Sequence, residues 1–376
     1  TINGGSYTNA TISVASHSGD LQINGGTFVC KGSYECFSLN KGVTTVNNAT
    51  VSGSTGIYVN GRDGITLNLN NSTVTGTGSF GVRLDGTYGS ANIKKSTIKS
   101  EKSDGIYSYT SKSLSIEDTS IVGYINGLST YNKTNIKGSE IIGQTKYGIR
   151  QNSGNSTLTI GEDDDDISTT APIIKGDTYG LYIENGITNI YDGIFKGQTG
   201  GYSGTITTMP DGYTLKEGTE DIDGVIYKTN YLGENTAFLQ VGDKKFNTIN
   251  KAIAEAKETG NEIVLIDDAN TTSQGTIDEN VNITIDLNGH TLSMSQPLSS
   301  AGNLTLKDSG EEKSGKLVNS STTNNAYVIE STGTLNIGDV NILGYNGIKA
   351  GGVTTIDGTK IELTNSGAGV YGVSST

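Results

Sequence analysis

The segment ITLNLNNSTVTGTGSFGVRL, residues 65–84, contains the pattern that decides the fold. An alternating apolar run is followed by a turn, then by Ser/Thr-apolar-x-Gly, and after a short gap by Gly-apolar-x-apolar. Strict alternation of apolar and polar residues over a few positions is typical of a half-buried β-strand. The segment therefore predicts three short strands separated by turns, with no helix between them.

The same pattern recurs along most of the chain, for example in LSIEDTSIVGYINGLST (114–130) and TNIKGSEIIGQTKYGIRQN (134–152). The position that begins the last strand returns about every 22 residues, a period typical of solenoid repeats. It falls at Cys36, Gly56, Gly81, Gly105, Gly127, Gly148 and Gly180, and again at Ala326, Gly347 and Gly369. Because one coil cannot bury its apolar face alone, we expect coils to stack ~4.8 Å apart as a parallel β-helix.

Two solenoid units are expected, because residues 201–243 lack the pattern. We interpret 201–243 as a β-rich cap or linker between a first β-helix unit, 1–200, and a second, 244–376. In the strands of both units the alternation predicts that residues such as Ile57 point inward and Tyr58 outward.

A single helix is predicted at the start of the second unit. In KKFNTINKAIAEAKETGNE, apolar residues recur at the spacing of one helical face, at Phe246, Ile249, Ile253 and Ala256. We place this helix at residues 247–258, with Asn247 as its cap and Gly260 at its end. A solenoid exposes its core and strand edges at an open end, so the helix is expected to cover the first coil.

The composition excludes some classes of partner. The chain of 376 residues has a formal net charge of −13, which argues against nucleic acid or an anionic membrane as the main partner. No apolar stretch is long enough to insert into a membrane. The opening, TINGGSYTNAT, resembles the middle of a repeat. We therefore expect the chain to be part of a longer protein, with targeting and anchoring segments outside it.

The two cysteines, Cys30 and Cys36, have no His or further Cys nearby to complete a zinc site. In a secreted protein they could close one small disulfide loop, and in a reducing compartment they would be two small buried side chains. The sequence leaves both interpretations open.

Four consecutive aspartates, Asp163–Asp166, follow a predicted strand and precede another, so they lie in a turn that interrupts the regular coil. Runs of like charge are usually solvated. Asp163 and Asp165 could supply some oxygens to calcium, but the ligand pattern of an EF-hand is missing. We therefore predict a solvated loop and no cofactor, with calcium binding as the alternative.

One set of side chains is expected to line up on the outside of the first unit. The outward position after each repeat start is occupied by Ser38, Tyr58, Arg83, Tyr107, Ser129, Arg150 and Tyr182, and in the second unit by Lys349 and Tyr371. Tyr rings stack on sugars, and Arg forks hold carboxylates or hydroxyls. The column is either a binding face formed by Tyr58, Arg83, Tyr107, Arg150 and Tyr182 or a surface ladder in which Tyr and Arg cover each other.

Two longer segments carry a family resemblance. VGDKKFNTINKAIAEAKETGNEIVLIDD, followed by ITIDLNGHTL, resembles a module of large surface proteins of Gram-positive bacteria, and LTIGEDDDDISTTAPIIKGDTYGLY resembles a rung of the same group. These proteins belong to the pectate-lyase-like right-handed parallel β-helix superfamily. The resemblance implies an all-β, right-handed parallel β-helix and an extracellular location, attached to the cell surface or cell wall.

The same superfamily contains polysaccharide lyases and glycoside hydrolases as well as adhesins and stalks. Its lyases use a calcium-binding Asp cluster beside an Arg or Lys base, but Arg62, Arg83 and Arg150 lie in no lyase motif. His290 and His17 have no partner in view and are interpreted as structural residues of turns.

We therefore predict that the chain is not an enzyme. The expected role is a monomeric adhesin or stalk segment that presents a binding face to host or microbial glycans or to a matrix protein. The alternative is a polysaccharide lyase or glycoside hydrolase of the same superfamily.

Overall fold

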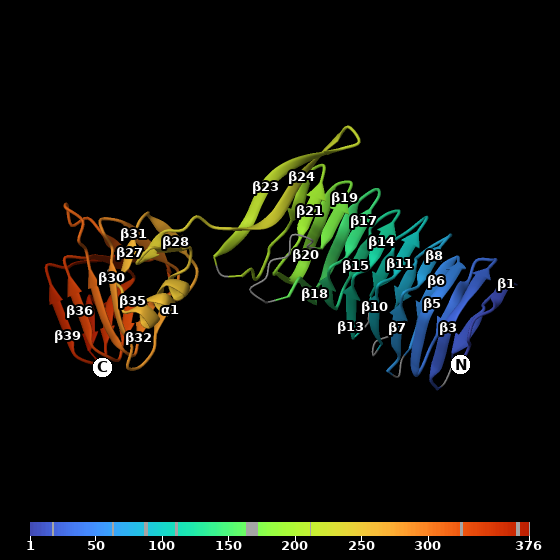
Figure 1. Cartoon of the computed structure of the whole chain (residues 1–376), viewed down its shortest axis with the longest axis horizontal. Coiled ribbons are helices and arrows are strands. Elements are labelled where there is room, and N and C mark those ends of the chain that lie inside the picture. The colour runs from blue at the N-terminus through green and yellow to red at the C-terminus, as the bar shows by residue number, and fades with distance from the viewer. Residues whose placement is uncertain are drawn as a thin grey trace. The chain divides into compact units, whose positions relative to one another are not determined.

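The computed structural model of the protein describes residues 1–16, 19–61, 64–85, 89–109, 112–162, 172–210, 212–323, 326–365 and 369–375. The chain forms two compact units, Thr1–Gly233 and Glu234–Thr376. Together they contain a β-solenoid of about 15 turns, with about 23 residues per coil and one short helix (Figure 1). The predicted all-β parallel β-helix is confirmed.

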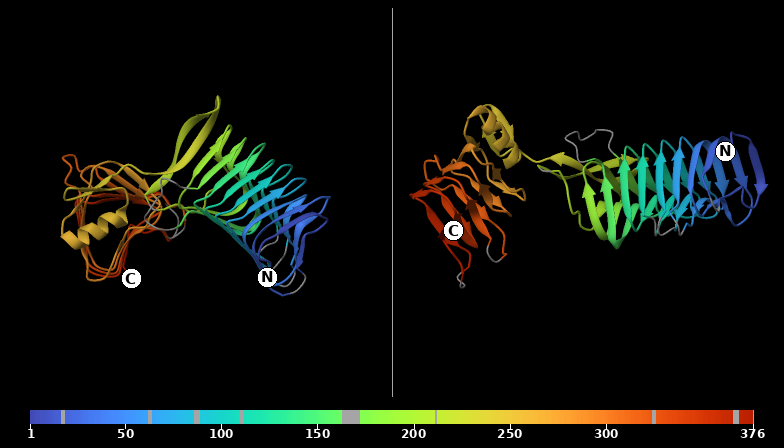
Figure 2. Two further views of the ribbon diagram at one scale, coloured as in Figure 1. Left: turned by 45° about the vertical axis from the view of Figure 1, so that its right-hand side comes forward. Right: turned by 90° about the horizontal axis from the view of Figure 1, so that it is seen from below.

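The first unit stacks its strands in three parallel rows (Figure 2). The first row contains β3 (Leu21–Cys30), β5 (Val43–Gly53), β7 (Thr66–Asn70), β10 (Ser90–Lys94), β13 (Ser113–Glu117), β16 (Lys133–Lys137) and the second halves of β18 (Tyr147–Ile160) and β20 (Tyr179–Ile190). The second row contains β1 (Ser6–Ala10), the second halves of β3 and β5, β8 (Thr73–Gly76), β11 (Thr97–Ser100), β14 (Ser120–Gly123), β17 (Glu140–Gly143), β19 (Ile173–Gly176) and β21 (Ile194–Gly197).

The third row is the one that carries the predicted column. It contains β2 (Val14–Ser16), β4 (Glu35–Leu39), β6 (Thr55–Val59), β9 (Val82–Leu84), β12 (Ile106–Ser108), β15 (Leu128–Thr130), the first halves of β18 and β20, and β22 (Gly200–Ser203). Inward positions such as Ile57 and Val59 are buried, whereas Tyr58 between them is only partly buried. The predicted alternation is confirmed.

A left-handed residue marks the bend between the first and second rows. Asn71, Lys95 and Asp118 have φ values of 47°, 49° and 48°, and Gly138 has the same conformation with φ 48°. In each coil a buried Ser or Thr follows, and these side chains are Ser72, Ser96, Thr119 and Ser139. We call these four residues the hydroxyl ladder.

Each hydroxyl of the ladder makes the same two hydrogen bonds. Ser96 Oγ donates to the carbonyl of Lys94 at 2.8 Å and accepts the backbone N–H of Ser72, one coil earlier, at 3.2 Å. Thr119 accepts the N–H of Ser96 at 3.3 Å, and Ser139 accepts that of Thr119 at 3.1 Å. The ladder therefore supplies partners for backbone N–H groups that would otherwise be buried without one.

Glycine is required where the third row begins because neighbouring coils approach closely there. A Cβ atom on Gly105 would lie 2.6 Å from Cγ2 of Ile121 and 2.7 Å from the carbonyl oxygen of Gly127 in the next coil. A backbone oxygen cannot move away as the end of a flexible side chain can, so a side chain here pushes two coils apart.

Gly105→Ala is therefore expected to destabilise the first unit by about 1–3 kcal/mol. Thermal melting followed by circular dichroism measures the change. Gly154→Ala is the matched control, because a Cβ there has no atom within 4 Å. Equal melting temperatures for the two variants would contradict the proposed close approach.

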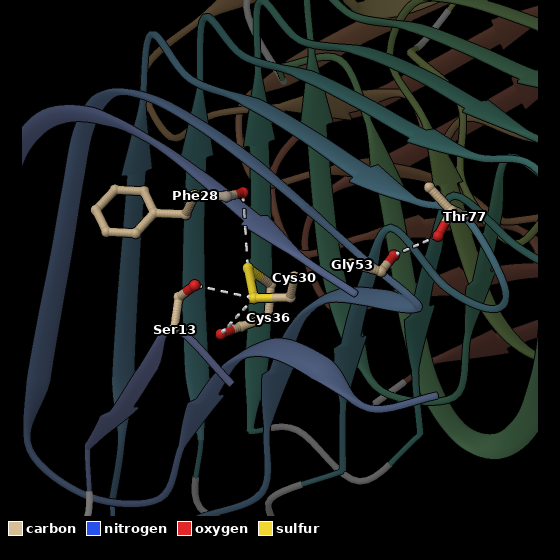
Figure 3. Close-up of a disulfide and its surroundings, with 6 residues drawn as sticks. All are labelled: Ser13, Phe28, Cys30, Cys36, Gly53 and Thr77. Carbon is tan, nitrogen blue, oxygen red and sulfur yellow. Dashed lines mark hydrogen bonds between the residues drawn. A yellow bond between two sulfur atoms is a disulfide. The ribbon is translucent and has the colours of Figure 1, made fainter. Parts of the chain in front are cut away.

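Cys30 and Cys36 form a disulfide that joins the end of β3 to β4, with their Cα atoms 5.3 Å apart (Figure 3). The hydroxyl of Ser13 donates to Cys30 Sγ at 3.0 Å, since a disulfide sulfur carries no proton. On the next coil a Cβ on Gly53 would lie 2.9 Å from that of Cys36, and Thr77 donates to the Gly53 carbonyl at 3.1 Å. Of the two interpretations left open by the sequence, the structure has the disulfide.

A hairpin of β23 (Tyr213–Ile222) and β24 (Val225–Glu234) follows the last coil of the first unit (Figure 1). β24 pairs antiparallel with β21, and Lys196 contacts Glu220 at 2.8 Å. The ammonium of Lys175 lies 4.5 Å from the ring centroid of Tyr227. These contacts fix the hairpin to the last coil of the first unit. The boundary between the two units lies between Gly233 and Glu234, so the segment predicted as a cap or linker, 201–243, is divided between them.

The second unit has three sheets of its own. The first contains β26 (Lys244–Phe246), β25 (Leu239–Val241), β27 (Ile263–Leu265), β30 (Asn282–Asp286), β33 (Asn303–Lys307), β36 (Leu335–Gly338) and β39 (Thr354–Asp357). The second contains β28 (Ala269–Thr271), β31 (Thr291–Met294), β34 (Lys316–Asn319), β37 (Asn341–Gly344) and β40 (Lys360–Leu363). The third contains β29 (Thr276–Ile277), β32 (Leu298–Ser300), β35 (Tyr327–Ser331), β38 (Asn346–Ala350) and β41 (Val373–Ser375).

Helix α1 (Ile249–Thr259) packs against the first coil of the second unit, as predicted (Figure 2). Its buried residues are Ile249, Ala252, Ile253 and Ala256. The predicted bounds, 247–258, were wrong by one or two residues because Thr248, not Asn247, caps the helix by accepting the N–H of Lys251. Gly260 ends it with φ 71°, as expected.

Ile253→Asp is expected to destabilise the second unit by several kcal/mol, on the order of 3, because it buries a carboxylate in the apolar contact between α1 and the coil. The matched control is Ala254→Asp, since Ala254 is exposed on the same helix. Thermal melting of the two variants should separate them clearly. A melting curve for Ile253→Asp that coincides with the control would exclude the capping role.

Candidate functional site

Strand register brings the predicted binding residues into one column on the third row. Successive register partners along the stack are Ser38, Tyr58, Arg83, Tyr107, Ser129, Arg150 and Tyr182. The order and spacing are those predicted, so the placement of Tyr58, Arg83, Tyr107, Arg150 and Tyr182 is confirmed. Their role in binding stays a prediction.

The structure adds five aromatic residues that the sequence did not single out. Phe80, Tyr147 and Tyr179 each lie three positions before a column residue, and Tyr109 and Tyr131 each lie two positions after one. The period of two in a strand could have revealed Tyr109 and Tyr131. We call the whole surface the aromatic face, and it consists of Tyr58, Phe80, Arg83, Tyr107, Tyr109, Tyr131, Tyr147, Arg150, Tyr179 and Tyr182.

Ring contacts divide the aromatic face into two clusters. In the first, the ring centroids of Tyr107 and Phe80 are 4.9 Å apart, and Tyr131 lies 5.7 Å from Tyr107 and 5.2 Å from Tyr109. Tyr107 and Tyr131 are partly buried, and Tyr109 is half-exposed. The rings therefore support one another while leaving part of their surface to solvent.

The second cluster is flatter. Tyr147 and Tyr182 stack with centroids 4.3 Å apart and an interplanar angle of 11°. Tyr179 lies 5.9 Å from Tyr182 at 24°, which extends the stack by one ring. Tyr147 and Tyr179 are tilted by 31° to each other, so the platform consists of one nearly parallel pair and a third ring at its side. A flat ring can stack on a platform of this kind.

The two arginines of the aromatic face are paired within the protein. The guanidinium of Arg83 contacts the Asp85 carboxylate at 2.6 Å and lies 5.2 Å from the ring centroid of Tyr58. Nε of Arg150 contacts the Glu184 carboxylate at 2.7 Å. Each positive charge is thus balanced by a neighbouring carboxylate, and the face has little net charge.

Three tyrosines of the face, Tyr58, Tyr107 and Tyr147, have raised pKa values. Burial, with a further contribution from Tyr131, raises the pKa of Tyr107 to about 12. Burial also raises the pKa of Tyr58 and of Tyr147. These three side chains therefore offer neutral phenol groups rather than phenolates.

A buried carboxylate lies directly beneath the column. Asp104 is only 6% exposed, and its Oδ1 accepts the backbone N–H of Asn126 at 3.1 Å and the side-chain amide of Asn126 at 3.0 Å. Its Oδ2 accepts the hydroxyl of Ser129 at 2.7 Å. Burial raises the pKa of Asp104, and these hydrogen bonds oppose the shift without cancelling it.

The same position has a structural role in other coils. Asn126 Oδ1 accepts the N–H of Tyr147 at 3.2 Å, and Asn346 Oδ1 accepts that of Tyr371 at 2.8 Å. Each side chain accepts a backbone N–H from the following coil, as Asp104 does. We therefore interpret Asp104 as a residue that fixes the third row rather than as a catalytic acid.

Asp104→Asn is expected to be at least as stable as the parent at neutral pH. A raised native pKa means that the folded state binds more protons than the unfolded state between the ordinary Asp pKa and the raised value. The free energy of unfolding therefore falls as pH rises through that window. The variant should lack this decline, because the amide oxygen accepts the Asn126 N–H without ionising.

Melting temperatures of parent and variant between acidic and neutral pH test this expectation. A variant that keeps the full pH dependence of the parent and is less stable at neutral pH would show that the charged carboxylate is favourable.

The remaining predicted site residues are either structural or outside the described part of the chain. His290 is half-buried in a turn, where its backbone N–H donates to the Leu287 carbonyl at 2.7 Å and its side-chain Nδ1 lies 3.5 Å from Asp268 Oδ1. Four other residues of interest, His17, Arg62, Asp163 and Asp165, lie outside the described residues. Among the residues that are described, no three His, Cys, Asp or Glu side chains converge as a metal site would require.

The predicted place of Tyr371 was wrong. Lys349 pairs with Glu330 on one side and with Ser374 on the other, so Ser374 occupies the outward position of the last coil. The coil starts at Gly372 rather than Gly369, since the N–H of Ile348 donates to the Gly372 carbonyl at 2.9 Å. The column of the second unit consists of Thr276, Ser299, Glu330, Lys349 and Ser374.

No protein-family model matches the chain, and neither a curated protein nor a solved structure matches it. Within the described residues, no helix has the length and apolar character needed to cross a membrane.

Proposed function

We propose that the first unit is a glycan-binding segment of a non-catalytic adhesin or stalk at the surface or in the wall of a Gram-positive bacterium. The observation that carries the proposal is the aromatic face itself, in which eight aromatic side chains and two arginines share one outer surface of the third row. Tyr rings with exposed hydroxyls can stack on a sugar ring and hydrogen-bond to it at the same time.

The chemistry of the face favours a neutral, extended, β-linked glycan. Arg83 and Arg150 are already paired with Asp85 and Glu184, so the face lacks the free positive charge that an acidic polysaccharide would need. Coils repeat every ~4.8 Å, which is close to the length of one sugar residue in an extended chain. A glycan lying along the column would therefore meet a new outward side chain at nearly every residue.

An extracellular location is supported by the Cys30–Cys36 disulfide, because disulfides persist in oxidising compartments and are rare in the cytosol. The formal net charge of −13 keeps such a protein soluble. The family resemblance of the segment that begins at VGDKKFNTINKAIAEAKETG points to the same location.

Catalysis is not part of the proposal. The buried carboxylate nearest the column, Asp104, has both oxygens engaged by Asn126 and Ser129. A glycoside hydrolase needs a pair of carboxylates exposed to substrate at a defined separation. Asp85 and Glu184 on the face are instead ion-paired with the arginines.

The double variant Arg83→Ala/Tyr107→Ala is expected to weaken binding to cellohexaose and to the hexamer of N-acetylglucosamine. Each exposed stacking or polar contact contributes ~1 kcal/mol, so the loss of two corresponds to about a 30-fold rise in Kd. A glycan array first ranks the neutral β-linked glycans. Isothermal titration calorimetry of the full chain then measures the Kd of parent and variant.

The matched control is Asn92→Ala/Ser115→Ala, which removes two outward polar side chains from the first row without touching the aromatic face. Circular dichroism confirms that both double variants keep the fold. Parent-like binding by Arg83→Ala/Tyr107→Ala would show that the column is a structural ladder. Binding to immobilised matrix protein but to no glycan would replace the proposed ligand with a protein.

A further inference from the structure

The aromatic face ends at a defined place. In the column, Tyr182 is followed by Ser203, and beside it Tyr179 is followed by Gly200, both on β22. A Cβ on Gly200 would lie only 3.1 Å from the ring of Tyr179. Because Gly200 has no side chain, nothing at that position covers the ring edge on the side of β22.

The β23–β24 hairpin borders β22 at this end. Its strand β24 is held against β21 by pairing that includes Gly197 with Lys228, and Asn230 is buried beside Gly201. The Lys196–Glu220 ion pair adds a side-chain contact from β21, and the Lys175–Tyr227 contact adds one from β19. The hairpin is therefore part of the first unit and not a free arm.

A hollow of about 630 Å³ lies between the hairpin and the end of the third row. Its wall on the coil side is formed by Thr199, Gly200 and Tyr202, and its wall on the hairpin side is formed by Glu217, Gly218, Thr219, Lys228, Thr229 and Asn230. It combines an aromatic ring with hydroxyl, amide, carboxylate and ammonium groups. Pockets for small ligands have volumes of roughly 300–1,000 Å³, so one or two sugar residues fit.

We infer that this hollow binds the terminal residue of the glycan whose following residues lie on the aromatic face. Gly200 lines the hollow and is the register partner of Tyr179, so the hollow begins beside the ring of Tyr179. Glu217, Gly218 and Thr219 of the hairpin form the far wall of the hollow, so a chain whose end enters the hollow stops there. The protein therefore recognises chain ends rather than internal stretches, an inference that rests on the proposed glycan-binding function.

Thr219→Trp tests the inference by filling the hollow with an indole. Thr219 is exposed on the hairpin, so the change should not disturb the fold. The full-chain variant is expected to bind cellohexaose about 10-fold or more weakly than the parent. The matched control, Ile226→Trp, introduces the same side chain on the same hairpin outside the hollow, where Ile226 is 57% exposed, and should bind as the parent does.

A second measurement uses a long soluble cello-oligosaccharide and counts bound protein by analytical ultracentrifugation. Recognition of one chain end predicts one protein per chain whatever its length. Several proteins on one chain, or parent-like binding by Thr219→Trp, would overturn the inference. If the inference about the hollow is overturned in this way, weaker binding by Arg83→Ala/Tyr107→Ala would still support glycan binding by the aromatic face. A parent that binds neither cellohexaose nor the N-acetylglucosamine hexamer would overturn the proposed function and this inference with it.

Discussion

The first unit depends on one repeated hydrogen bond. At the bend between the first and second rows, a backbone N–H of each coil donates to a buried hydroxyl of the next coil. Ser72, Ser96 and Thr119 each donate such an N–H and also accept one. Because the donor and the acceptor occupy the same position of successive coils, only one register satisfies every group, and a slip would leave polar atoms buried without partners. The same register fixes the columns of the third row, so the aromatic face follows from it.

The two units use similar coils to display different surfaces. In the first unit the outward column of the third row is rich in Tyr and Arg, whereas in the second it is formed by small polar and charged residues around Glu330 and Lys349. The inward positions on the same strands are aliphatic in both units, as at Ile106 and Ile348. A solenoid separates the requirement for stability from the requirement for recognition, because inward residues determine stability while outward residues can vary with the ligand.

The sequence was sufficient to predict the coil, the inward positions and the order of the column, because all three follow from a period and an alternation. It was insufficient wherever the chain leaves a strand. Phe80 and Asp104 lie in turns between strands, where alternation no longer tells which way a side chain points. Thr248 and Asn247 are both good helix caps, and only the fold selects the first. The disulfide could not be predicted, because it depends on the bend of the chain that brings Cys30 near Cys36.

The stack of parallel strands also determines how the first unit would respond to force. Its strand-to-strand hydrogen bonds run along the solenoid axis, so a pull on the chain detaches one coil at a time instead of loading all coils together. Each coil of about 23 residues releases ~75 Å of extended chain. The Cys30–Cys36 bond, whose cysteines are only 6 positions apart, withholds just the short segment between them from that extension. In a surface tether, such a unit would lengthen in steps and lower the peak load on a bound glycan.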